Sequence, residues 1–225
     1  MIKKKALIAV LVTLLLGTCM VFASCGGFDA GAYVKESLDY VKTGNITDEY
    51  LKMTGMSMEE AQKEYDDSVE KLVNKMIDVV GIDSYNTEDN KQTVRDFAKT
   101  MLASLRYDIS EEVKEKDGSY FVEANVYPVK AMLEMDSYLD DEFTPEWEKK
   151  ISSGSYKFTT EDQLMIDMMN DFMTRFTDKI KNSEYGEPQT IKLEVKFDKN
   201  EDMYKVTDDS IDKLLNTAFG DTFGE

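Results

Sequence analysis

The amino-acid sequence predicts an α+β protein in which helices pack on an antiparallel sheet built from two hairpins. Residues 120–126 and 191–197 alternate apolar and polar side chains, which is typical of strands with one buried face. The pair Asp117-Gly118 precedes the first of these segments and indicates a hairpin turn. Apolar residues at helical spacing occur before, between and after the hairpins, and this order favours helices that are segregated from the sheet.

The first 24 residues have the composition of an export signal. The basic stretch Lys3–Lys5 is followed by the apolar run Ala6–Ala23, and small residues end the run. This is the order that secretory signals need. The run has 18 residues, which is also just long enough to span a bilayer. In either case the lysines would stay inside the cell and the remaining chain would lie outside.

The end of the apolar run carries a candidate lipid attachment site at Cys25. The segment Phe22-Ala23-Ser24-Cys25 resembles the lipobox of bacterial lipoproteins, although phenylalanine stands where leucine is usual. The resemblance implies a signal peptide over residues 1–24, cleavage before Cys25, and fatty acids such as palmitate carried on the modified cysteine. Cys19 is the alternative, but it lies inside the apolar run and follows the bulkier Thr18.

Lipidation at this position would hold the protein at the outer face of the cell membrane. One acyl chain gives a binding constant of only about 10⁴ M⁻¹, so two chains are needed for slow release. Residues 25–28 form a short tether, because three or four extended residues span only roughly 10–14 Å. We therefore expect the folded part to lie close to the membrane.

Length and composition bound what the mature chain can do. Residues 29–225 are enough for one well-formed core and indicate a single extracytoplasmic domain. Loss of the signal changes the formal net charge from −18 to −21, so we expect no nucleic-acid partner. The sequence has no histidine and no cysteine after Cys25, which excludes Ser-His-Asp catalysis, His-ligated zinc and internal disulfides.

Capping residues predict where the helices begin and end. Asp29 is a candidate N-cap for a helix that runs to Thr43 and stops at Gly44, and residues 45–54 add one or two helical turns. Capping boxes at Ser57–Glu60 and Thr160–Gln163 open two long helices. Further helices begin after Thr87 and after Thr207 or Asp208. The apolar faces expected to be buried are Ala61, Tyr65, Val69, Leu72, Met76 and Val80; Val94, Phe97, Ala98, Met101, Leu102 and Leu105; Leu164, Met165, Met168, Met169, Phe172, Phe176 and Ile180; and Ile211, Leu214, Leu215, Ala218 and Phe219.

The strands are predicted from residue spacing. Tyr107, Ile109 and Val113 are separated by even steps and are expected to share one face of the first strand. A short strand, Met203–Val206, should pair with the segment 191–197. Residues 129–160 have no clear period, and only Thr144-Pro145 predicts a short helix there.

Two resemblances follow from these segments. The hairpin Tyr107–Tyr127 and the block Ile191–Phe219 resemble the cystatin-like and NTF2-like superfamily, which implies helices packed in the concavity of a curved sheet. The segment 25–30 and the terminal strand and helix resemble uncharacterised lipoproteins of clostridial-type Gram-positive bacteria. That family implies an extracellular location and no established activity.

Three groups of side chains could carry chemistry. Asp136, Asp140, Asp141 and Glu142 lie near Tyr138, Trp147 and Tyr156, as carboxylates and sugar platforms would in a glycoside hydrolase. The acidic segments 198–202 and 83–86 could bind calcium weakly, although neither fits the EF-hand pattern. Met53, Met56 and Met58, and the group Met165, Met168 and Met169, could bind copper or simply fill the core.

We therefore expect a membrane-anchored lipoprotein that binds a small ligand or another envelope protein and needs no cofactor. The sequence leaves two alternatives open. One is a cell-envelope hydrolase with paired carboxylates, and the other is a structural or assembly lipoprotein recognisable by a flat apolar patch.

Overall fold

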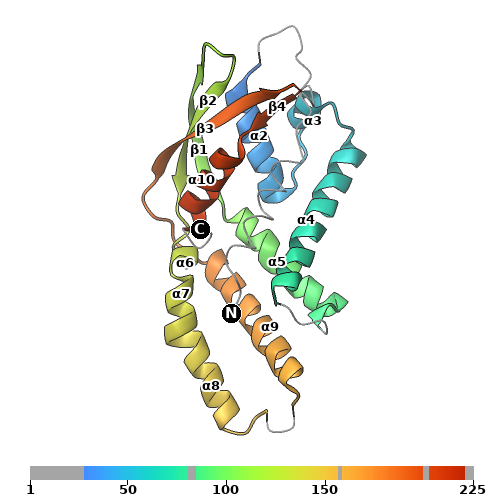
Figure 1. Cartoon of the computed structure of the whole chain (residues 1–225), viewed down its shortest axis with the longest axis vertical. Coiled ribbons are helices and arrows are strands. Elements are labelled where there is room, and N and C mark those ends of the chain that lie inside the picture. Colours follow the sequence, from blue (N-terminus) through green and yellow to red (C-terminus); the bar gives the residue numbers. More distant parts are fainter. Residues whose placement is uncertain (1–27, 81–84, 157–158, 200–202, 221–225) are drawn as a thin grey trace.

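A computed structural model of the chain describes residues 28–80, 85–156, 159–199 and 203–220. The predicted export signal, Cys19, Cys25, Gly81, Asp83, Ser84 and residues 200–202 of the acidic segment 198–202 lie outside these residues, as does the side chain of Val80. Figure 1 shows an elongated molecule, with a sheet and its helices in one half and a helical extension in the other.

The sheet has four antiparallel strands in the order β1-β2-β3-β4. These strands are β1 (Arg106–Lys114), β2 (Tyr120–Tyr127), β3 (Gln189–Asp198) and β4 (Met203–Val206). The two predicted hairpins are confirmed, and they join where β2 pairs with β3, so that Val122 lies opposite Leu193. Alternate residues of β2 are buried, as the period of two predicts: Tyr120, Val122, Ala124 and Val126.

Two helices cover one face of the sheet, α2 (Ala30–Thr43) and α10 (Asp208–Phe219). Side chains of both helices, among them Leu38 and Ile211, meet around Leu193 of β3. Helix α2 begins and ends as predicted: the Asp29 carboxylate accepts a hydrogen bond from the Ala32 amide at 2.8 Å, and Gly44 ends the helix with φ +68°. The inward face predicted for α10 is also buried.

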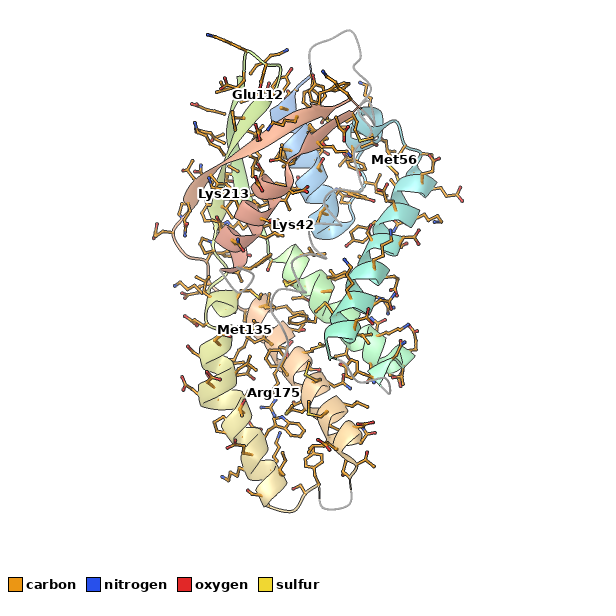
Figure 2. The ribbon with its side chains drawn as sticks, in the orientation of Figure 1. Lys42, Met56, Glu112, Met135, Arg175 and Lys213 are labelled. Atoms are coloured by element: carbon orange, nitrogen blue, oxygen red, sulfur yellow. The ribbon has the colours of Figure 1, made fainter. Side chains whose placement is uncertain are left out.

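A β-bulge in β1 changes which residues face the helices. Ile109 lies opposite Ala124 and Glu112 opposite Val122, so β1 carries one extra residue between them. The expectation that Val113 shares a face with Tyr107 and Ile109 is therefore wrong, because the bulge turns Val113 to the other face, where it is 48% exposed. Glu112 instead points to α2 and accepts a hydrogen bond from the Gly31 amide at 2.8 Å (Figure 2).

Three helices continue the core beside the sheet: α3 (Asp48–Thr54), α4 (Met58–Val80) and α5 (Glu88–Ala103). The predicted capping box is present, because the Ser57 amide donates to Glu60 at 2.9 Å and the Glu60 amide donates to the Ser57 hydroxyl at 3.3 Å. Thr87 caps α5 as expected. The predicted apolar face of α5 is buried throughout, and that of α4 is buried at every described side chain.

Residues 130–181 form a helical extension with two arms. The first arm falls within residues 129–160, the segment that had no clear period. Short helices α6 (Lys130–Leu133) and α7 (Met135–Ser137) lead into a π-helix, η2 (Tyr138–Phe143), and then into α8 (Thr144–Ser152). Helix α8 begins at Thr144 as predicted, but it continues directly from η2 without a side-chain cap. Helix α9 (Glu161–Lys181), capped by Thr160, returns alongside it (Figure 1).

A buried polar network ties the extension to α5. The Tyr85 hydroxyl donates to Asn170 of α9 at 2.7 Å, Asn170 donates to Asn90 of α5 at 2.8 Å, and Asn90 donates to the Tyr85 carbonyl at 3.0 Å. Burial raises the pKa of Tyr85 to about 12, so this hydroxyl keeps its proton well into the alkaline range. Each polar group in this network has a partner, as buried polar groups require.

The α+β fold class is confirmed by these elements. Helices α2 and α10 on one face of the sheet are what the likeness to the cystatin-like and NTF2-like superfamily implies. Membership of that superfamily stays a prediction. Among the described helices, none is long and apolar enough to cross a membrane.

Candidate functional site

The candidate site is a groove of about 670 Å³ at the base of the helical extension. It lies where α6 and η2 face the C-terminal end of α9, close to the junction with the sheet. Its walls are mostly polar, with Tyr138 and Phe176 as its aromatic members. The residues that line it are Lys130, Ala131, Glu134, Ser137, Tyr138, Asp141, Glu142, Phe176, Lys179, Asn182, Ser183 and Glu184.

The π-helix shapes this groove. Tyr138 and Phe143 are buried, and both pack on Phe172 of α9, with ring centroids 6.3 and 5.3 Å away. The Thr144 amide donates to the Leu139 carbonyl five residues earlier, which is the π-helical hydrogen bond. The wider turn lets aromatic residues five positions apart face α9 while Asp141 and Glu142 border the groove. Such π-helical turns occur frequently at functional sites.

Two lysines that line the groove form ion pairs with glutamates that also line it. Lys130 donates to Glu184 at 2.8 Å, and Lys179 lies 3.6 Å from Glu142. The ammonium of Lys179 also lies 4.3 Å from the centre of the Tyr138 ring, which is cation–π geometry. The hydrogen bond from Lys130 holds the pKa of Glu184 below its usual value. A general acid would need a raised pKa, so this pairing does not prepare Glu184 to act as a general acid.

The carboxylates proposed for a hydrolase do not face one another. Asp136, Asp140, Asp141 and Glu142 follow one another along α7 and η2, and all four are exposed. Their aromatic neighbours are not open platforms, because Tyr138 and Trp147 are 8% and 3% exposed, and the half-buried Tyr156 packs on Trp147 with ring centroids 5.2 Å apart. The interpretation of these aromatics as sugar platforms is therefore wrong, since they form the interface between the two arms of the extension.

Below the groove, Arg175 of α9 joins the arms of the extension, as Figure 2 shows. Its guanidinium donates to both oxygens of Glu146 at 2.7 and 2.9 Å and to Asp171 at 2.7 Å. Asp171 also accepts from the Trp147 indole at 2.9 Å. Hydrogen bonds from Arg175 and Lys150 lower the pKa of Glu146 to about 2. Burial alone would raise the pKa of Asp171, but its hydrogen bonds with Arg175 and Trp147 outweigh burial and lower it.

These pKa directions predict that acid weakens the ion pairs between the two arms. Both carboxyl groups have a lower pKa in the folded protein than in the unfolded chain, so their stabilisation is present at neutral pH and is lost as pH falls. For Glu146 the loss runs from about 4.5 to about 2. Trp147 is the only tryptophan, and we expect its fluorescence to shift to longer wavelengths over this range.

Replacement of Arg175 tests the assignment of this acid transition. In Arg175→Gln the two carboxyl groups lose one of their two shared partners and keep Lys150, so their pKa values rise and the fluorescence change should begin at higher pH. Lys63→Gln is the matched control, since it breaks the exposed Lys63–Asp67 pair on α4 and should leave the Trp147 transition in place. An unchanged midpoint in Arg175→Gln would contradict the assignment.

A second hollow of about 680 Å³ lies on the other side of α6. It is bordered by one side of α10 along its length and by the start of β3. Asn216 lines it, and the side-chain Oδ1 of Asn216 is buried without a hydrogen-bond donor among the described residues. Two carboxylates, Asp209 and Asp212, and one lysine, Lys213, share this hollow, so it is polar like the first groove.

The metal-binding hypotheses receive no specific support from the described residues. Asp198, the described acid of one predicted calcium turn, accepts a hydrogen bond from Lys205 at 3.2 Å. In the described part of the chain, no group of three or more acidic, cysteine or histidine side chains is placed to hold a metal ion. Met169 is buried, whereas Met165 and Met168, expected in the core, are only half-buried on the same helix. Met53 and Met56 pack against the core.

Sequence patterns missed an aromatic cluster at the end of the sheet farthest from the extension. Phe28 stacks on Tyr204, with ring centroids 3.9 Å apart and an interplanar angle of 6°. It also contacts Tyr33 at 5.4 Å and Tyr120 at 5.2 Å, while Phe197 packs edge-on against Tyr204. We call Phe28, Tyr33, Tyr120, Phe197 and Tyr204 the aromatic end. The alternation of β2 and β3 gave a partial signal, but nothing in the sequence pairs Phe28 with them.

The chain therefore has an α+β fold. Its antiparallel sheet is covered by helices, a helical extension lies beside the sheet, and a polar groove lies at their junction. No known protein family matches the sequence, and no curated protein matches it. One solved structure with a similar fold is YcdA from Bacillus subtilis subsp. subtilis str. 168, described as a candidate lipoprotein. The TM-score is 0.51 at 15% sequence identity, so the likeness concerns the fold. It covers 92% of this chain and 57% of YcdA, and this chain therefore spans little more than half the length of YcdA.

Proposed function

We propose that the chain is a lipoprotein anchored through Cys25 at the outer face of the bacterial cell membrane. The observation that carries this proposal is the order of Lys3–Lys5, the apolar run Ala6–Ala23 and the Ser24-Cys25 pair. The similarity in fold to a candidate lipoprotein supports it. The resemblance to clostridial-type lipoproteins is part of the same proposal, and so are cleavage after residue 24 and acylation with palmitate or similar chains.

Metabolic labelling with an alkynyl fatty acid tests the attachment site. We expect the wild-type protein and Cys19→Ser to incorporate the label, because Cys19 lies within the predicted signal. Cys25→Ser should lose the label completely, since no other cysteine follows in the sequence. Mass spectrometry of the mature N-terminus should find the modification on Cys25. Label retained in Cys25→Ser, or lost in Cys19→Ser, would show that the assignment is incorrect.

The extracytoplasmic domain acts by binding a small ligand or another envelope protein, and the groove is the proposed binding site. Its polar walls and the lysine–glutamate pairs Lys130–Glu184 and Lys179–Glu142 could exchange partners with a ligand that carries charged or hydrogen-bonding groups. The carboxylate of Glu184 is held ionised by Lys130, which suits an ion-pairing contact with a ligand. We expect the purified domain to turn over no glycan, peptide or ester in a substrate panel. Measurable turnover that disappears in Glu142→Gln or Glu184→Gln would favour a hydrolase instead.

A further inference from the structure

The position of Phe28 fixes where the chain enters the folded body. Phe28 follows Cys25 by three residues, and its ring is held between Tyr204, Tyr120 and Tyr33. The next residue, Asp29, caps α2. A residue with this many ring contacts is part of the fold and not of a loose linker. The tether is therefore limited to residues 25–27.

A tether of this length leaves little freedom of orientation. Three residues at full extension separate the Cα atoms of Cys25 and Phe28 by at most about 11 Å. The polar region of one leaflet is itself roughly 5–7 Å thick. We propose that the aromatic end and the adjoining β1–β2 turn, residues 115–119, rest against the lipid headgroups of the outer leaflet. This orientation rests on the proposed acylation of Cys25.

The side chains at this end suit a membrane interface. Val113 is 48% exposed and Phe197 is 36% exposed, two of the few large apolar side chains that the described surface leaves open. The Lys114 ammonium lies 5.1 Å from the centre of the Tyr120 ring. Tyr33 and Tyr120 are themselves buried, so the surface offered to the headgroups is Phe197, Val113 and the stem of Lys114. Exposed apolar side chains and lysine stems are favoured at headgroup level, where apolar atoms are buried and polar ends stay in water.

The charged side chains near the aromatic end neither drive nor prevent its contact with the lipid headgroups. Three carboxylates near the aromatic end have partners within the protein: Glu112 on the Gly31 amide, Asp117 on Ser119, and Asp198 on Lys205. Glu111 and Glu115 remain exposed beside Lys114, Lys116 and Lys196, so the charges at this end are mixed. Repulsion between the acidic chain and anionic lipids is screened beyond about 8 Å. The covalent anchor is therefore what holds this end in place.

The orientation places the helical extension away from the membrane, because the β1–β2 turn and α8 lie at opposite ends of the molecule (Figure 1). The 8 residues of β2 and the 21 residues of α9 are roughly 26 and 31 Å long. The groove would then stand on the order of 25–30 Å above the headgroups, and the α8–α9 turn nearly twice as far. A ligand or envelope protein could reach the groove without displacing lipid.

Single-cysteine labelling tests the orientation, because the acylated mature protein has no free thiol. Lys116→Cys puts a fluorophore on the β1–β2 turn, and the matched control Ser152→Cys puts it on an exposed position at the far end of α8. Both full-length variants are purified from membranes and reconstituted in vesicles of phosphatidylglycerol and phosphatidylethanolamine. A nitroxide-headgroup lipid then quenches fluorophores that lie at the headgroups.

We expect the label at position 116 to lose roughly half its fluorescence or more and the label at position 152 to be unaffected, because quenching needs headgroup contact. Equal quenching of the two labels, or stronger quenching at position 152, would overturn the orientation while leaving the anchor intact. Labelling of the parental protein, or failure of the protein to float with vesicles, would instead show that Cys25 is not acylated. The proposed function and this inference would then fall together.

Discussion

Replacement of Phe176 by alanine is expected to lower the free energy of unfolding by about 3–5 kcal/mol. Phe176 is completely buried at the centre of a group of rings. Its ring centroid lies 5.3 Å from that of Phe172, 5.7 Å from Tyr138 and 6.4 Å from Phe97. These neighbours belong to α9, η2 and α5, so one side chain joins both arms of the extension to the rest of the core.

The large effect follows from the position of the cavity. Removal of the ring loses the free energy gained by transferring its atoms from water to the core. It also leaves a cavity, and α9, η2 and α5 would all have to move to fill it. Phe197→Ala is the matched control, because the same atoms are removed from a side chain that is 36% exposed. Urea unfolding, monitored by Trp147 fluorescence and far-UV circular dichroism, measures both changes. Equal losses of stability in the two variants would contradict the central role of Phe176.

Elements with local end signals could be predicted from the sequence. The helix between Asp29 and Gly44 and the one opened by Ser57 and Glu60 have the predicted caps. Each of these signals is a backbone amide satisfied by a side chain a few residues away, or a backbone angle that glycine adopts readily. The alternation in β2 and β3 was equally informative, because one face of the sheet is covered by α2 and α10 and the burial follows the pleat.

The bulge in β1 could not be predicted in the same way. Val113 continues the even spacing from Ile109, and nothing between them signals an inserted residue. What favours the bulge is distant in sequence, since it turns Glu112 towards the Gly31 amide in the first turn of α2. A carboxylate at a helix N-terminus is favoured by the helix dipole as well as by the hydrogen bond. This part of the register goes with a contact across 81 residues, which no local pattern signals.

Most of the first arm of the extension could not be predicted, because its period is irregular, whereas α9 and the start of α8 have local signals. Tyr138 and Phe143 are five residues apart, and Phe143 and Trp147 are four apart, yet all three are buried. A regular α-helix would rotate the first pair out of alignment, whereas the π-helical turn brings them onto the same side. A search for the 3.6-residue period finds no continuous apolar face in such a segment. The groove was missed with it, since its walls come from residues 130–142 and 176–184.

The site residues show the same division between local and distant signals. Cys25 and its lipobox-like context could be proposed from the sequence alone, because export signals are read as contiguous sequence, and this site stays a prediction. The docking of Phe28 on Tyr204 depends on chain segments that meet only in the folded protein. The acidic residues Asp136 to Glu142 leave the hydrolase alternative open in the sequence, because the sequence does not show that their aromatic neighbours are buried. Their burial against α9 became visible only once both arms of the extension were in place.

Substitution of Gly44 by alanine is the second change with a large expected effect, a loss of about 2–5 kcal/mol of stability. Gly44 ends α2 with φ +68°, and its amide donates to the Tyr40 carbonyl at 2.7 Å. A Cβ atom at this position would lie 2.7 Å from Cε1 and 2.8 Å from Cζ of Tyr65. Tyr65 is itself buried on α4 and packs edge-on against Tyr40.

Two separate costs act at Gly44, and a control can divide them. The left-handed backbone costs an alanine roughly 1–2 kcal/mol, and the contact with the Tyr65 ring adds an overpacking cost of about 1–3 kcal/mol. Gly118→Ala carries only the first cost, because Gly118 has φ +89° and its Cβ would meet nothing within 4 Å. Thermal and urea unfolding should therefore find Gly44→Ala less stable than Gly118→Ala by the overpacking cost alone. Equal stability would mean that the Tyr65 ring moves freely, and that the end of α2 is not held by its packing on α4.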